Sequence, residues 1–95
     1  MHVVFLKFGP NRAQAGQWMA GHNQWIQDGI RDGVFLLAGS LDSAQGGAVL
    51  AVKLTREELA ARVQADPFVE HGVVVPEIHG IAPSRMAEGF AVLAA

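Results

Sequence analysis

One histidine in this sequence stands where an imidazole could act as an acid or a base. His22 follows Trp18 by one helical turn and precedes Ile26 by another, on the apolar stripe of a predicted helix, so its side chain should point inward. Such a histidine is either a core imidazole bound by a backbone carbonyl or a general acid and base that titrates near neutral pH. Position alone favours the structural role and leaves the catalytic role open.

Asp66 is the carboxylate that could orient this imidazole. It precedes Pro67, and Asp-Pro at a helix start is typical of a short turn whose carboxylate caps a following N–H, here that of Phe68 or Val69. Because a carboxylate has two oxygens, one can cap the turn while the other accepts from the ring of His22. That second bond would fix the tautomer of the imidazole and favour its protonated form. The residues alone favour capping over the pair.

Three further residues are candidates for binding a substrate. Ser40 ends a predicted strand, where its hydroxyl could orient a substrate oxygen, although serines at strand ends usually bond to local backbone. Arg12 opens the first predicted helix and could hold an anionic group, but an exposed arginine is the commoner case there. Phe68 is expected in the core or in the wall of a cleft.

Several classes of site lack support. The chain has no cysteine, and therefore no disulfide, thiolate nucleophile or cysteine-ligated metal. His71, Glu77 and His79 have no spacing typical of a metal site. The glycine pair 46–47 joins two strands instead of leading into a phosphate-binding helix, and Ser40 lies on a strand instead of a hydrolase nucleophile elbow. We expect neither metal nor cofactor.

Apolar patterning predicts the elements that must position these residues. The expected strands are 3–8, 34–41, 48–54 and 73–82, and the expected helices are 12–31 and 55–65. Asn11 is expected to cap the first helix, and Thr55 with Glu58 forms a capping box for the second. Trp25 lies off the apolar stripe and should be partly exposed. Pro76 places the last strand at a sheet edge.

The order β-α-β-β-α-β predicts an α+β, ferredoxin-like fold, the split βαβ arrangement with both helices on one face of an antiparallel sheet. The 95 residues form a single domain, with a core at 3–82 and a tail at 83–95. The first three strands are apolar on both faces, and a chain of this length buries only roughly 60 to 65 % of its surface on folding. We therefore expect a homodimer, on which the apolar residues of the tail could dock.

Charge and hydropathy limit the partners and the compartment. The chain has seven basic and nine acidic residues, and its basic residues do not form a stripe, so nucleic acid is not an expected partner. The apolar run at the N-terminus is too short for a signal peptide or a membrane span, so no membrane partner is expected. Together with the lack of cysteine, this predicts a cytoplasmic protein.

An ordered set of motifs resembles the YCII-related (YciI-like) family over about residues 3–82. The motifs are an arginine opening the first helix, a histidine ten residues later, the end of the second strand and an Asp-Pro-Phe turn, here Arg12, His22, Ala38-Gly39-Ser40 and Asp66-Pro67-Phe68. The sequence departs from the pattern at Ser40, where proline is common, at His71, where a small residue is usual, and at 80–82, which replace a proline-aromatic ending.

This resemblance implies a dimeric α+β barrel with a small-molecule pocket beside a His22–Asp66 pair, and it favours the catalytic role of His22. We expect a cofactor-free lyase or isomerase, with dehydrohalogenase-like or muconolactone-isomerase-like chemistry on a small cyclic or aromatic oxygenated compound. His22 would move a proton, Asp66 would orient its ring, and Ser40, Arg12 and Phe68 would bind the substrate. The alternatives are a non-catalytic metabolite-binding or interaction domain and cofactor-independent oxygenation.

Overall fold

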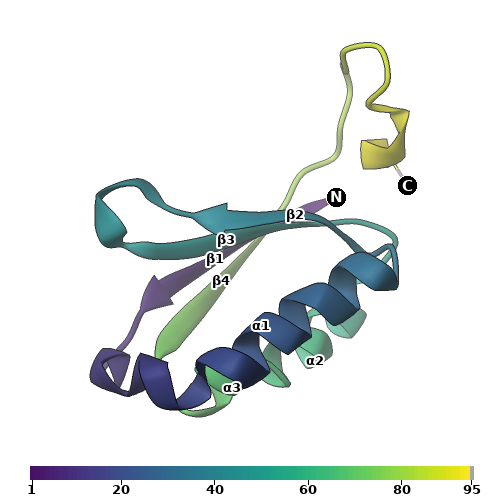
Figure 1. The fold of residues 1–95 in the computed structure, drawn as a ribbon. Coiled ribbons are helices and arrows are strands. Elements are labelled where there is room, and N and C mark those ends of the chain that lie inside the picture. Colours follow the sequence, from purple (N-terminus) through teal and green to yellow (C-terminus); the bar gives the residue numbers. More distant parts are fainter. Residues whose placement is uncertain (95) are drawn as a thin grey trace.

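The computed structural model describes residues 1–94, and in them a four-stranded antiparallel sheet carries its helices on one face (Figure 1). The strands are β1 (His2–Phe8), β2 (Phe35–Ser40), β3 (Gly46–Ala51) and β4 (Val74–Gly80). The α-helices are α1 (Ala15–Arg31), α2 (Arg56–Gln64) and α3 (Pro67–Glu70), and the 3-10 turns are η1 (Arg12–Gln14), η2 (Asp42–Ala44) and η3 (Ala91–Ala94). The strand order β2-β3-β1-β4 confirms the ferredoxin-like α+β prediction. The predicted tail runs to Ala95, which lies outside the described residues.

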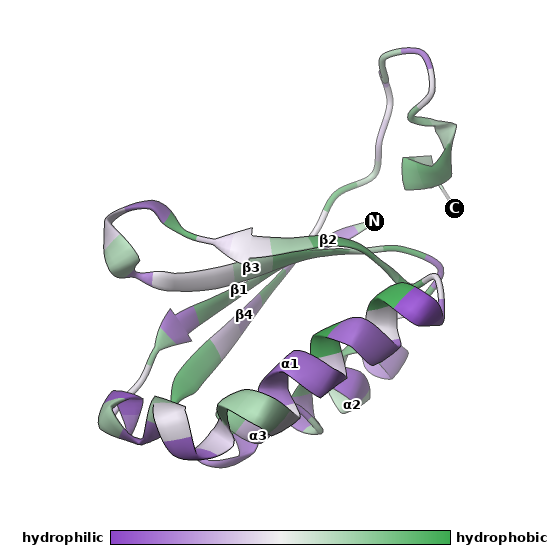
Figure 2. Ribbon diagram, in the orientation of Figure 1, coloured by the Kyte–Doolittle hydropathy of each residue, from purple (hydrophilic) through white to green (hydrophobic). Residues whose placement is uncertain are grey.

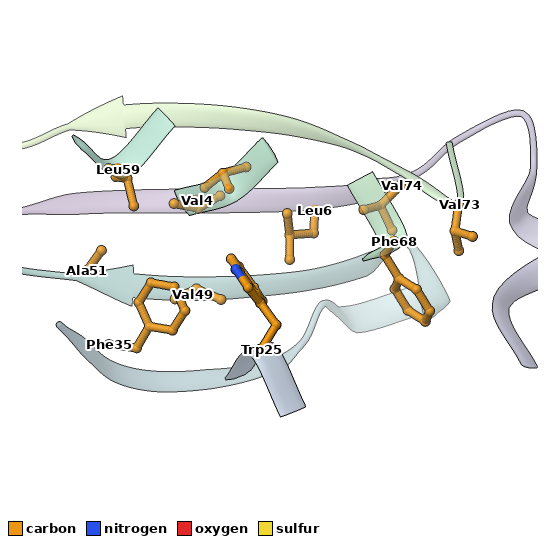
Figure 3. Packing of buried hydrophobic residues seen from close by; sticks show 11 residues of the cluster. Val4, Leu6, Trp25, Phe35, Val49, Ala51, Leu59, Phe68, Val73 and Val74 are labelled. Atoms are coloured by element: carbon orange, nitrogen blue, oxygen red, sulfur yellow. The ribbon is translucent and has the colours of Figure 1, made fainter. Parts of the chain in front are cut away.

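The core lies between the sheet and the helices. Side chains of a strand alternate between its two faces, so Val4 and Leu6 of β1 point to the helices and are buried. They are joined there by residues from every other strand and from all three helices (Figure 3): Trp25, Phe35, Val49, Ala51, Leu59, Val63, Phe68, Val73 and Val74. Burial of this cluster holds α1, α2 and α3 on one face.

Helix α1 approaches β2 closely at Gly29. A Cβ atom at this position would overlap the ring of Phe35, so only glycine lets the helix and the strand come this near. Trp25 packs edge-on against the same ring, with 4.9 Å between ring centroids. The expectation of a partly exposed Trp25 is wrong: the residue is 8 % exposed, because its indole N–H donates to the carbonyl of Arg62 at 2.9 Å and ties α1 to α2.

The two helix starts differ from each other. The capping box of α2 is confirmed, since Thr55 Oγ1 accepts from the N–H of Glu58 at 3.1 Å and Glu58 Oε1 accepts from that of Thr55 at 2.9 Å. The cap predicted at Asn11 is wrong. Its backbone is not extended, and its side-chain amide donates instead to the carbonyl of His71 at 2.9 Å, linking the start of α1 to the end of α3.

The strand ends follow backbone constraints that local hydropathy does not show. The third strand begins earlier than predicted, at Gly46, whose φ of 128° and close approach to the carbonyl of Leu6 admit only glycine. It also ends earlier, at Ala51, and Lys53 takes a left-handed φ of 64° before α2. Pro76 does lie on an edge strand, because β4 comes last in the strand order of the described sheet and pairs with β1.

Within residues 1–94, no helix packs on the other face of the sheet (Figure 1). Apolar side chains dominate this open face, which includes Val3, Phe5, Leu37, Leu50 and Val75. One ion pair crosses it, from Lys7 Nζ to Glu77 Oε2 at 2.7 Å. After β4 the chain leaves the body as an extended segment on the side of the open face (Figure 1). No helix in residues 1–94 is long and apolar enough to cross a membrane.

Candidate active site

The structure brings His22 and Asp66 into contact across forty-four positions of sequence. Nδ1 of His22, on α1, lies 2.8 Å from Oδ1 of Asp66, the residue before α3. The side chain of Asp66 is 0 % exposed and that of His22 is 12 % exposed. With Asp66 Oδ1 as the acceptor, the proton of this hydrogen bond lies on Nδ1, and Nε2 is the other ring nitrogen.

The local sequence holds the carboxylate of Asp66 in place. The backbone of Asp66 is extended (φ −65°, ψ 123°), Pro67 occupies the first turn of α3, and Asp66 Oδ1 accepts from the N–H of Phe68 at 3.0 Å. The prediction that one oxygen caps the turn while the other binds His22 is wrong, because Oδ1 both accepts from the N–H of Phe68 and contacts Nδ1 of His22. Oδ2 is buried and has no hydrogen-bond partner within residues 1–94.

Aromatic stacking fixes the plane of the His22 ring. Phe68 lies parallel to it, with 3.9 Å between centroids and 5° between planes, and Trp25 lies 6.0 Å away at 23°. One turn earlier on α1, Trp18 stacks on His71 at 3.6 Å and 3°. The imidazole is therefore held by a ring on its face and by a carboxylate on its edge, which leaves its orientation little freedom.

A cavity of about 400 Å³ opens beside the pair, between α1 and the sheet. This volume is within the range of small-molecule sites. The cavity exists because the positions of β2 and β3 that face α1 carry small side chains, namely Ala38, Ser40 and Gly47. The remaining walls are mostly apolar: Leu6, Phe8, Ala15, Met19, Ile26, Ala48, Val49, Phe68 and Val74, with His22, Asn23, Gly39 and Gly46 completing them.

Three of the five predicted site residues line this cavity: His22, Ser40 and Phe68. Asp66 lies behind His22 and reaches the cavity only through the imidazole. Arg12 does not line the cavity. Its guanidinium lies 4.0 Å from the ring centroid of Phe8, and Phe8 is one of the residues that line the cavity. The structure thus brings the His22–Asp66 pair, Ser40 and Phe68 to one cavity and leaves Arg12 outside its lining.

Asn23 is a polar residue of the cavity wall that reasoning from the sequence did not identify. It follows His22 on α1 but lies off the apolar stripe of the helix, so the helical pattern gives no reason to place it in a cavity wall. The signal that could have found it is the run of small residues on one face of β2 and β3. Small side chains on the sheet leave space beneath the helix, so residues at the side of the helix, such as Asn23, can line that space.

Charged groups elsewhere form surface pairs away from the cavity. A hydrogen bond from Arg62 lowers the pKa of Asp32, and one from Lys7 lowers the pKa of Glu77. Burial, helped by the N-terminal ammonium group and Arg56, lowers the pKa of His2. No group of three or more His, Asp or Glu residues in positions 1–94 is arranged to hold a metal ion.

Comparison with known proteins finds a likeness among solved structures. No family model matches the sequence, and no curated protein matches it. Among solved structures, the fold is similar to 5-chloro-2-hydroxyhydroquinone dehydrochlorinase (TftG) from Burkholderia phenoliruptrix AC1100, determined in complex with 2,5-dihydroxybenzoquinone. The two share 13 % sequence identity with a TM-score of 0.69, over 84 % of this chain and 91 % of that chain. At this level of identity, the likeness shows the fold.

Proposed function

We propose that this protein is a YciI-like enzyme, a cofactor-free lyase or isomerase that acts on a small cyclic or aromatic oxygenated compound. The observation that carries the proposal is the 2.8 Å contact between His22 Nδ1 and the fully buried Asp66, at the wall of a cavity of about 400 Å³. A buried carboxylate that orients an imidazole is a common arrangement for general acid and base catalysis.

In the proposed reaction, Nε2 of His22 takes a proton from a substrate carbon or hydroxyl. In an elimination, the electrons of the broken C–H bond form a double bond, and the leaving group departs with its bonding pair. In an isomerisation, the imidazolium returns the proton to another atom. The anionic Asp66 stabilises the imidazolium that forms between these steps, strongly so because both groups are shielded from water.

The cavity walls suit a flat, oxygenated ring. Apolar side chains and the face of Phe68 offer contact to a ring, and the hydroxyl of Ser40 and the amide of Asn23 can bind its oxygen atoms. Binding of an anionic group by Arg12 stays a prediction, since its guanidinium lies over Phe8. The TftG complex holds a dihydroxybenzoquinone, which supports a ligand of this class for a related fold.

We also propose that the protein is a homodimer in which a second copy covers the open face. Soluble monomers rarely leave a contiguous apolar patch of this kind in water. A pair of ferredoxin-like sheets packed through such faces under two-fold symmetry would bury both patches at once.

The alternative function is a non-catalytic metabolite-binding domain with a structural His–Asp pair. It is favoured by one observation, namely that Asp66 Oδ1 also caps α3, so the carboxylate has a structural role in any case. The two functions differ in what His22→Gln should do. An enzyme should lose turnover and keep ligand binding, whereas a binding domain should show no turnover in either form.

The test is a mass-spectrometric screen of small phenols, lactones, muconate-like acids and chlorinated hydroquinones with wild type and His22→Gln. Conversion by wild type that falls at least about 100-fold in the variant supports general acid/base catalysis. Conversion that His22→Gln leaves intact would refute the assigned role. Binding of 2,5-dihydroxybenzoquinone by both forms, without conversion of any compound, would favour the binding domain.

A further inference from the structure

Residues 83–94, which follow β4, form an arm whose backbone hydrogen bonds lie within the arm itself. The β1–β4 ladder ends with two hydrogen bonds between Met1 and Ile81, at 2.9 and 3.1 Å. We call residues 83–94 the C-terminal arm. Its backbone hydrogen bonds are internal, from Phe90 N–H to the carbonyl of Ala87 and from Leu93 N–H to that of Phe90. The backbone hydrogen bonds of the arm are thus made within its own turns, while Ala94 lies near Met1 and His2 at the start of β1.

The arm exposes large apolar side chains. Met86 is 41 % exposed, Phe90 is 53 % exposed and Val92 is 38 % exposed, and Figure 2 shows the end of the arm as a hydrophobic segment. The whole chain has an accessible surface of 5703 Å², against about 5300 Å² for a compact protein of this mass. Its radius of gyration is 13.4 Å, against about 12 Å for a compact chain of this length. A lone copy therefore exposes more surface than its size requires.

The position of the arm indicates what covers it. It rises on the side of the open face, away from the helices (Figure 1), and Ile81, exposed at its base, joins the two apolar surfaces. Its only charged residues are Arg85 and Glu88, which cancel. A neutral apolar arm lacks the basic clusters that nucleic acid or anionic lipid would require. Another copy of this chain presents the complementary surface, namely an apolar open face.

We propose that the C-terminal arm clasps a second copy of this chain, with Phe90 and Met86 buried against the partner subunit. The proposal rests on the homodimer put forward above and adds the segment that holds it. Two-fold symmetry makes the contact reciprocal, so each dimer contains two such arms. Each arm then lies beside the open face of the partner subunit, which the first subunit's own open face covers. Loss of one side chain therefore removes two contacts from every dimer.

The test compares dimer dissociation constants by analytical ultracentrifugation for the full chain, Phe90→Ser, Met86→Ser and the control Ile30→Ser. Ile30 is 49 % exposed, similar to Phe90, but lies on α1 in the helix layer. We expect each arm variant to raise the dissociation constant at least tenfold, about 1.4 kcal/mol, and the control to change it less than twofold. Circular dichroism checks that the monomer fold is kept. If the wild-type dimer is too tight to dissociate measurably, the rate of subunit exchange between labelled dimers replaces the constant, with the same expected ratio.

Three outcomes would overturn the proposal. Arm variants that dimerise like wild type would remove the arm from the interface and leave the dimer itself standing. An arm variant and Ile30→Ser with equal effects would indicate a general loss of apolar surface. A wild type that stays monomeric at micromolar concentration would end both the clasp and the homodimer, while the proposed chemistry would still be judged separately by the His22→Gln assay.

Discussion

Replacing Asp66 by asparagine removes the charge of the buried pair and changes its shape little. The amide oxygen of the variant can still accept from the N–H of Phe68 and cap α3, so the turn should survive. What is lost is the anion beside the imidazole of His22, at 2.8 Å and without exposure to solvent. The variant therefore separates the electrostatic role of Asp66 from its structural role.

The expected effects differ between stability and catalysis. Asp66→Asn should cost roughly 1 to 2 kcal/mol of stability, for one weakened charge-assisted hydrogen bond. Asp66→Ala should cost roughly 3 to 5 kcal/mol, because it removes the cap and leaves His22 without its buried partner. If His22 is the base, Asp66→Asn should also lower turnover by about 10² or more, because the imidazolium that forms loses its buried anionic partner.

Urea denaturation measures the stability losses of Asp66→Asn and Asp66→Ala. Nitrogen NMR of the His22 ring reports its tautomer directly. The proton should be on Nδ1 in wild type and stay there in Asp66→Asn, because the amide oxygen that caps Phe68 occupies the position of Oδ1 and can still accept from Nδ1. A double-mutant cycle with His22→Gln should give a coupling energy of roughly 1 to 3 kcal/mol for residues in direct contact. Additive losses, or an Asp66→Ala protein as stable as wild type, would refute the pair as an energetic unit.

Three further predictions concern packing, pH dependence and specificity. Gly29→Ala should destabilise the protein by roughly 1 to 3 kcal/mol in urea melts, because a methyl group would overlap Phe35; Gly16→Ala, which has open space around it, should instead stabilise α1 by up to about 1 kcal/mol. Arg62 lowers the pKa of Asp32 below its ordinary 3.8, so the ionised carboxylate stabilises the folded protein above that pH, and this stabilisation is lost as the pH falls through the lowered pKa. Thermal melts across the acid range should therefore show a smaller loss of stability on acidification for Arg62→Met than for wild type. An equal loss of stability in both proteins would contradict the assignment. Asn23→Leu should weaken binding of 2,5-dihydroxybenzoquinone roughly tenfold by calorimetry, about one hydrogen bond, and unchanged affinity would remove Asn23 from the binding wall.

Local features of the fold were predictable because their causes lie within a few residues. The capping box of Thr55 and Glu58 and the cap of Asp66 on α3 each join atoms at most three positions apart. Apolar periodicity likewise predicts four strands and two long helices, and their order suffices to predict the ferredoxin-like sheet. The failures at Asn11 and Trp25 have the opposite cause, since their partners are His71 and Arg62, distant in sequence.

The candidate site divides in the same way. The sequence by itself determined that His22 faces inward, that Asp66 caps a turn and that Ser40 ends a strand, because helical period, Asp-Pro chemistry and strand length are local properties. Their meeting at one cavity is a consequence of packing α1 against α3 and the sheet, over forty-four residues for the His22–Asp66 contact. Only the tertiary structure decided that Oδ1 of Asp66 makes both bonds, that Asn23 joins the cavity and that Arg12 does not, because these outcomes depend on small side chains in β2 and β3 and on distances between segments that no local pattern encodes.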